Sequence, residues 1–150
     1  MNYKNIIKLL NIFLPVLIGC LVYLCLRNDS FIIKLEQSCY LFYKLRQVCY
    51  IEFYPKTSTG IFIKYHLSDF CWAYSLGWTG LLVIEPCAKS ILISSFICIF
   101  NEYFQLLPFI NATFDFIDLF VYELGILISF LVYKLLKIKK FNEFKKTRFC

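Results

Sequence analysis

The chain has 150 residues, of which 60% are hydrophobic and 20% aromatic, and a formal net charge of +6. This length suits a single domain, and the apolar content exceeds the roughly one half that is typical of soluble domains. The composition therefore excludes an ordinary soluble domain and indicates an integral membrane protein. The basic residues lie at the ends of apolar runs and in the C-terminal tail. We therefore interpret the charge as a sign of topology and of contact with acidic lipid headgroups, and we expect no nucleic-acid partner.

The first apolar run covers residues 6–26, with Lys4 and Lys8 at its N-terminal end. A helix of that length is about 31 Å long and crosses a bilayer. A cleaved signal peptide is the alternative, because the stretch ending at Cys20 is similar to a lipoprotein processing site. The chain stays apolar after Cys20, whereas a lipoprotein normally turns polar there. The sequence therefore favours a retained transmembrane helix.

The loop at 27–64 is more polar and carries six basic residues and three acids. Within it, residues 31–46 can form a helix with Lys34, Gln37 and Ser38 on one side and apolar groups on most of the rest. This pattern predicts an interfacial helix lying along the membrane, and a re-entrant or partly buried segment is the alternative. The PKTSTG stretch at 55–60 predicts a turn.

Three further apolar runs have the length of a membrane span, and they cover residues 66–84, 90–107 and 116–137. The first of these runs is followed by Glu85 and Pro86, and the second ends at Pro108; proline disfavours helical geometry in the residue before it. The sequence thus predicts an all-α integral membrane bundle of four transmembrane helices. It forms one membrane domain over residues 1–150, with a basic tail at 138–150.

The distribution of basic residues predicts the orientation of this bundle. With four spans, both termini and the 85–89 loop share one side, which carries ten Lys or Arg residues, while the first loop carries six. Cytoplasmic segments are enriched in Lys and Arg. We therefore expect a multi-pass protein of the plasma or bacterial inner membrane with both termini in the cytoplasm. Seven of the ten basic residues lie from Lys134 onward, so the tail decides the prediction.

This topology brings polar residues from distant parts of the sequence to the outer surface. They are Asp69, Glu102, Gln105, Asp115 and Asp118, with His66 at the edge and Tyr122 on the same helix face as Asp118. Acidic residues within membrane segments are costly and usually functional. We therefore regard these seven residues as candidate ligand-binding residues.

Several of these candidates also have simpler explanations. Asp115 occupies a position where an N-cap acid is favoured. A hydrogen bond between Glu102 and Tyr122 that holds two helices together is as probable as a ligand role. Gln105 is better explained as an interhelical hydrogen-bonding group than as a catalytic one. A lone interfacial histidine such as His66 is usually solvated, and a proton relay is the minority interpretation.

The motifs around these residues resemble those of a known family. An E-x-x-Q motif leaves one apolar helix, T-F-D-x-x-D-L opens the next, and Y-x-x-G lies inside it. The matching residues are Glu102, Gln105, Pro108, Thr113, Phe114, Asp115, Asp118, Leu119, Tyr122 and Gly125, and the HLSDFCWAYSL stretch at 66–76 is also similar. This pattern resembles the VanZ-like family of small bacterial membrane proteins. Ser68 stands where that family has proline, and Ala112 where it often has glycine.

The resemblance implies a role in the cell envelope, because a founding member is linked with glycopeptide antibiotic resistance. We expect the outward polar residues to bind a lipid-linked or headgroup ligand. Expected partners are membrane lipids, a lipid-linked cell-wall precursor, another membrane protein, or a second copy of the chain. The same carboxylates would serve an ion- or proton-coupled transporter or an intramembrane hydrolase, so whether the chain is an enzyme stays open. Their oxygen atoms suit magnesium, calcium or manganese, but nothing in the spacing requires a metal, and no cofactor is predicted.

The eight cysteines show no zinc-ligand spacing. Cys39 and Cys49 share the first loop and can pair if that loop faces an oxidising space. The remaining cysteines have no such pairing, which favours Cys39 and Cys49 as packing residues as well.

Overall fold

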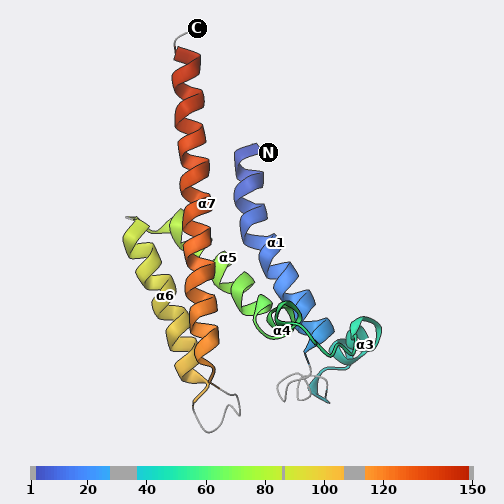
Figure 1. The fold of residues 1–150 in the computed structure, drawn as a ribbon. Helices are drawn as coiled ribbons and strands as arrows, with labels where there is room; N and C mark the ends of the chain where they lie inside the picture. The colour runs from blue at the N-terminus through green and yellow to red at the C-terminus, as the bar shows by residue number, and fades with distance from the viewer. Residues whose placement is uncertain (1–2, 28–36, 86, 107–113, 149–150) are drawn as a thin grey trace.

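The structure is a computed structural model, and it describes residues 3–27, 37–85, 87–106 and 114–148, with side chains described between residues 5 and 137 of those ranges. The described residues form six α-helices and no strand. The helices are α1 (Tyr3–Leu26), α3 (Tyr40–Cys49), α4 (Ser58–Tyr65), α5 (Leu67–Val83), α6 (Cys87–Phe104) and α7 (Phe116–Arg148) (Figure 1). The predicted all-α class is therefore confirmed.

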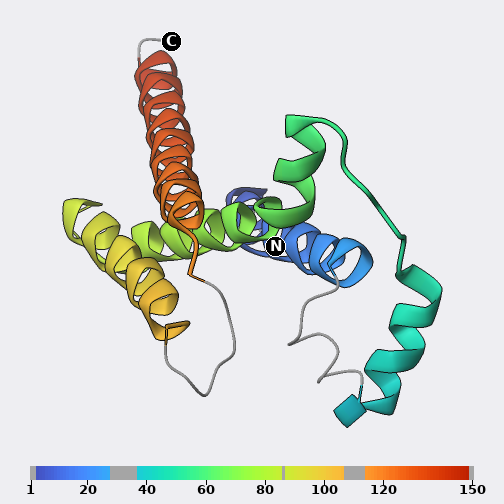
Figure 2. The same ribbon diagram turned by 60° about the horizontal axis from the view of Figure 1, so that its bottom comes forward.

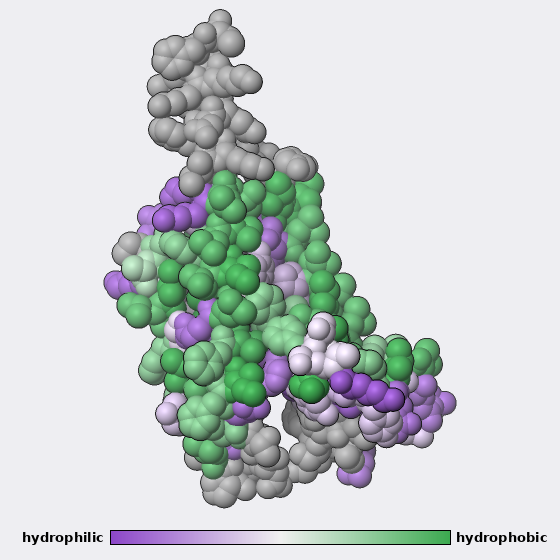
Figure 3. Space-filling view, viewed as in Figure 1, coloured by the Kyte–Doolittle hydropathy of each residue, from purple (hydrophilic) through white to green (hydrophobic). Residues whose placement is uncertain are grey.

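Among the described residues, three helices are long and apolar enough to cross a membrane, over Asn5–Leu26, Cys87–Phe104 and Phe116–Lys137. Large apolar side chains on all three point outward, for example Phe13, Phe96 and Phe120, which are 63%, 68% and 78% exposed. Figure 3 shows that hydrophobic residues cover most of one face of the bundle, with hydrophilic residues gathered at the lower right over α3. A protein with such a surface belongs in a lipid environment.

The predicted second span, α5, differs from these three helices. Its 17 residues give a helix about 25 Å long, short of the roughly 30 Å hydrocarbon core. It packs against α1, α4, α6 and α7, and Figure 2 shows it crossing between α1 on one side and α6 and α7 on the other. Ala73 and Trp78 on α5 are almost fully buried. In the described part of the chain, length and composition thus single out three helices that could span a membrane, and α5 packs against all three.

Glycines allow α5 to approach its neighbours closely. A Cβ atom added to Gly125 of α7 would lie 2.8 Å from the carbonyl oxygen of Phe70 and 3.1 Å from the backbone nitrogen of Tyr74. One added to Gly77 of α5 would lie 2.5 Å from Oγ of Ser129 on α7. Small residues at such contacts are typical of helix packing in membranes, where close backbone approach replaces the hydrophobic driving force.

The predicted turn at 55–60 is wrong in its second half, because α4 already begins at Ser58. Thr57 is the N-cap of this helix, and its hydroxyl accepts a hydrogen bond from the backbone N–H of Gly60 at 3.2 Å. A threonine in that position satisfies a free amide of the first turn, which is why a turn-like sequence starts a helix.

The other boundaries differ by a few residues. The predicted helix at 31–46 corresponds in part to α3, which is shifted to Tyr40–Cys49, and the earlier residues 31–36 lie outside the described part of the chain. Helix α6 begins at Cys87 and ends at Phe104, three residues earlier at each end than expected. Helix α7 continues past the span into the basic tail as far as Arg148. No glycine or proline follows Gly125, so nothing in that sequence stops the helix.

Candidate functional site

The helix ends bring the sequence-predicted residues together. Helices α1 and α6 end, and α5 and α7 begin, toward the end of the bundle opposite the two chain termini (Figure 1). We call the group gathered there the polar cluster, and it consists of Arg27, His66, Asp69, Glu102, Gln105, Asp115, Asp118 and Tyr122. All seven candidates from the sequence are in it, together with Arg27, which the sequence analysis did not single out.

Glu102, near the end of α6, is fully buried, and its carboxylate accepts three hydrogen bonds within the polar cluster. Its Oε1 accepts a hydrogen bond from the backbone N–H of Asp115 at 3.0 Å. Its Oε2 accepts from Nε2 of Gln105 at 2.7 Å and from the hydroxyl of Tyr122 at 3.3 Å. The hydrogen bond between Glu102 and Tyr122, one of the two roles considered for Glu102, is therefore present. Gln105 supports the carboxylate of its own segment instead of joining two helices.

Asp115 is the residue immediately before α7 and caps it. Its Oδ1 accepts a hydrogen bond from the backbone N–H of Ile117 at 2.8 Å, and its carbonyl oxygen accepts from the N–H of Asp118 at 3.2 Å. The predicted capping role is thus confirmed. Because the Asp115 N–H also donates to Glu102, this one residue joins the end of α6 to the start of α7.

His66 lies at the corner between α4 and α5 and is only 8% exposed. Its Nδ1 lies 2.7 Å from Oδ1 of Asp118 in the first turn of α7. The interpretation of His66 as a solvated interfacial histidine is therefore wrong. The change of direction at His66 places its ring inside the bundle. Hydrophobic periodicity does not predict this change, because only His66 separates α4 from α5.

Arg27 is the partner of Asp69. Its guanidinium donates to Oδ2 of Asp69 at 3.0 Å, to the carbonyl oxygen of Tyr65 and to that of Lys64 at 3.4 Å. One basic residue therefore ties the end of α1 to the corner between α4 and α5. The sequence could have predicted this pairing. Arg27 is the first charged residue after the first span, and the predicted topology places it at the same membrane level as Asp69.

The acidic side chains of the polar cluster interact electrostatically. Asp69 lies near enough to Glu102, Asp118 and His66 for their charges to interact. Among the described residues, the polar cluster has four carboxylates, one arginine and one histidine, so the site is electronegative when its acids are ionised. The field at this end of the bundle attracts cations and cationic groups and repels anions.

Three members of the polar cluster have the arrangement of metal ligands. One ligand atom each from His66, Asp115 and Asp118 lies within 4.8 Å of the other two. An imidazole with two carboxylates suits manganese, iron or zinc. The same side chains are also satisfied without an ion, because His66 pairs with Asp118 and Asp115 caps α7. Their arrangement accommodates a divalent cation without requiring one.

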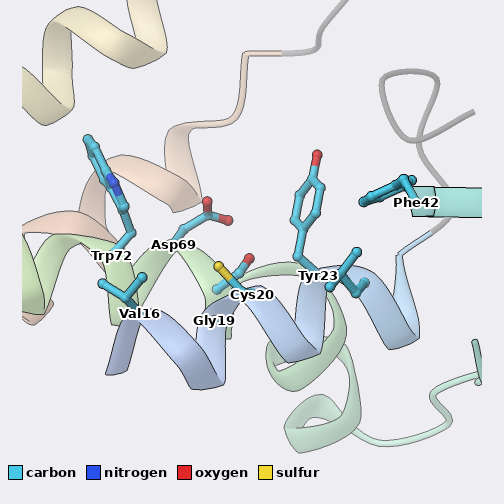
Figure 4. Close-up of a pocket in the computed structure, with 9 residues that line it drawn as sticks. Val16, Gly19, Cys20, Tyr23, Phe42, Asp69 and Trp72 are labelled. Atoms are coloured by element: carbon cyan, nitrogen blue, oxygen red, sulfur yellow. The ribbon is translucent and has the colours of Figure 1, made fainter. Parts of the chain in front are cut away.

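An apolar groove borders the polar cluster at Asp69. It has a volume of about 390 Å³ and is lined by Val16, Gly19, Cys20, Tyr23, Leu24, Phe42, Ser68, Asp69 and Trp72. Figure 4 shows residues of α1 along one side, with Trp72 and Tyr23 standing to either side of Asp69 and Phe42 beyond Tyr23. The buried hydroxyl of Ser68 has no hydrogen-bond partner among the described residues. The groove is thus apolar along its length, with an acid and an unsatisfied hydroxyl among its lining.

The chain matches no family model, no curated protein and no solved structure. Three positions of the motif pattern, Pro108, Ala112 and Thr113, lie outside the described residues.

Proposed function

We propose that this is a cell-envelope membrane protein resembling the VanZ-like family, in which the polar cluster binds the headgroup of a lipid or lipid-linked molecule at the outer face of the plasma membrane. The observation that carries the proposal is the contact between the apolar groove and Asp69 of the polar cluster. A lipid needs both an apolar channel for its chain and polar groups for its headgroup, and here the two adjoin.

The groove suits part of a lipid chain. Its volume of about 390 Å³ falls within the roughly 300–1,000 Å³ typical of small-molecule sites. Its walls come from α1, α3 and α5, and two of its lining residues, Cys20 and Trp72, are exposed. The carboxylate of Asp69 supplies a hydrogen-bonding group where a headgroup would begin, and the buried, unsatisfied hydroxyl of Ser68 precedes it in the chain.

The charge of the polar cluster limits the headgroup chemistry. Several carboxylates attract an amine and repel a bare phosphate. An anionic headgroup is compatible with the site only when a divalent cation held by His66, Asp115 and Asp118 bridges the two. We therefore expect an amine-bearing lipid to bind directly and a phosphate or pyrophosphate lipid to bind only in the presence of such a cation.

The arrangement of helices supports the four-span topology on which the outward location depends. Helix α6 begins toward the end of the bundle where both termini lie and runs away from it, so α5 carries the chain back from the opposite end (Figure 1). Although α5 is short, its burial among α1, α6 and α7 reduces the lipid surface that it must match. With the basic tail inside, the polar cluster lies at the outer surface.

Native mass spectrometry of the full-length protein with a headgroup series tests the proposal. The series is phosphatidylethanolamine, phosphatidylglycerol and an undecaprenyl pyrophosphate lipid, each with EDTA and with Mn²⁺. We expect selective retention of the amine lipid in EDTA and of the anionic lipids only with Mn²⁺. Equal retention of all lipids in both conditions would leave only unspecific annular lipid and overturn the proposal.

A second candidate is a small ion- or proton-coupled carrier, favoured by the partly buried pair of His66 and Asp118. A carboxylate and an imidazole in contact can exchange a proton, as proton relays in membranes do. Proton flux into protein-containing vesicles under a pH gradient separates the candidates. A flux that disappears in Asp118→Asn would favour the carrier over the lipid-binding protein.

A further inference from the structure

Two cysteines from different helices meet at the edge of the polar end of the bundle. Cys25 lies in the last turn of α1, and Cys49 is the last residue of α3. The backbone N–H of Ile51 donates to the carbonyl oxygen of Cys25 at 2.8 Å, which fixes the chain after Cys49 against the end of α1. Helices α1 and α3 contact each other, the two thiols are near enough to interact, and both side chains are partly exposed.

We propose that Cys25 and Cys49 are a redox pair that forms a disulfide between α1 and α3. The thiolate of one cysteine attacks the disulfide of an oxidant, either a disulfide-carrying protein or a small disulfide such as oxidised glutathione. The resulting mixed disulfide is then attacked by the second thiolate. The chain loses two electrons and two protons, and the oxidant leaves as two thiols.

The pairing of Cys39 with Cys49, considered from the sequence, is excluded while α3 is folded. Cys39 is the N-cap of α3 and Cys49 its last residue, so the ten-residue helix holds them about 15 Å apart. A disulfide requires Cα atoms within about 7 Å. Helix formation thus separates the two cysteines that share a loop and brings Cys49 to Cys25, which the sequence places at the end of a membrane span.

A disulfide between Cys25 and Cys49 would restrain the helices that form one wall of the groove. Phe42 of α3 and Tyr23 and Leu24 of α1 all line it, and the bond would join those two helices next to these residues. Oxidation would therefore hold α3 against α1 and fix one wall of the groove. This consequence depends on the proposed lipid-binding function, and oxidation in a cell further depends on the outward location of the loop. Formation of the bond itself depends on neither.

The experiment uses the full-length purified protein with oxidised glutathione as the oxidant. After oxidation, remaining thiols are blocked with a maleimide and the disulfide-linked peptides are identified by mass spectrometry. We expect a Cys25–Cys49 peptide and two fewer maleimide-reactive thiols than in the reduced protein. The linkage should persist in Cys39→Ser and disappear in Cys49→Ser, with helix content by circular dichroism unchanged in both.

Other outcomes would overturn the proposal. These are full maleimide labelling of Cys25 and Cys49 after oxidation, or linkage of Cys49 to Cys39 or Cys20 in its place. A separate measurement of lipid retention by the oxidised and reduced protein tests the effect on the groove. If the disulfide forms but no lipid is retained in either state, the redox pair stands and the lipid-binding function fails.

Discussion

Glu102 shows how one residue serves both structure and a candidate site. It is fully buried at the junction of α6 and α7, and three hydrogen bonds to its carboxylate offset part of the cost of burying it. The sequence could predict this residue and its contact with Tyr122, because helical spacing and topology place both on facing stripes. It could not predict the bond from the Asp115 N–H, which depends on the path of the loop between the helices.

Replacement of Glu102 by Gln separates these two roles. The amide oxygen can still accept from the Asp115 N–H, and Gln105 can rotate its amide to match the new donor, so the hydrogen bonds largely survive. We expect the melting temperature to hold or rise, because a buried acid is removed. Tyr122→Phe is the control, since it removes one bond worth about 0.5–1.5 kcal/mol and keeps the charge. A large loss of stability in Glu102→Gln, beyond that of Tyr122→Phe, would show that the charge itself holds the fold.

Asp115 and Asp118 offer a contrast between two acids three residues apart. Asp115 caps α7, and asparagine caps a helix about as well as aspartate. Asp118 instead pairs with His66. We therefore expect Asp115→Asn to reduce lipid retention less than Asp118→Asn does, measured by native mass spectrometry at equal protein concentration. Equal losses would mean that the charge of Asp115 acts on the ligand as strongly as that of Asp118.

Among the helices, α5 contacts α1, α4, α6 and α7, although it is the shortest of the predicted spans. Apolar runs predict α1, α6 and α7 well, because length and hydropathy carry the signal. Helix α4 was missed, because its start depends on the Thr57 cap within a turn-like sequence. The corner at His66 was missed for the same reason: it is a local feature that hydrophobic periodicity does not record.

Packing of α5 against α7 depends on Gly125. A methyl group there would meet the backbone of α5 at 2.8 and 3.1 Å, and backbone atoms cannot move aside as a flexible side chain can. We expect Gly125→Ala to destabilise the protein by about 1–3 kcal/mol. Thermal unfolding in detergent measures this, and Leu127→Ala, at a side chain 52% exposed on the same helix, is the control. If Gly125→Ala unfolds no earlier than Leu127→Ala, α5 and α7 do not pack as closely as described.

At the scale of the whole molecule, the helices place the termini and the polar cluster at different ends of the bundle (Figure 1). Both termini lie at one end of the bundle, and the polar cluster lies toward the other (Figure 1). The sequence could predict this convergence from the order of its apolar runs, because successive antiparallel helices alternate in direction. It could not predict the groove, which needs the relative positions of α1, α3 and α5.

Single cysteines labelled with a membrane-impermeant maleimide test the orientation. We expect Lys56→Cys to be labelled in intact cells, and Glu85→Cys and Lys145→Cys to be labelled only after the membrane is opened, on a background lacking other reactive cysteines. Lys56 is exposed between α3 and α4, so its environment does not hide it. Labelling of Glu85→Cys from outside would mean that α5 does not cross the membrane and that only three helices span.

The most direct test of the lipid-binding proposal compares lipid retention by the wild type and by the Glu102→Gln, Asp118→Asn double variant. Both proteins are purified in one detergent, shown to have the same helix content, and examined by native mass spectrometry with phosphatidylethanolamine in EDTA. We predict that the wild type retains the lipid and that the folded double variant loses it. Lipid binding depends on the carboxylate charges of Glu102 and Asp118, whereas folding does not. Undiminished retention by the folded double variant would contradict the account and leave the polar cluster as a set of structural hydrogen bonds.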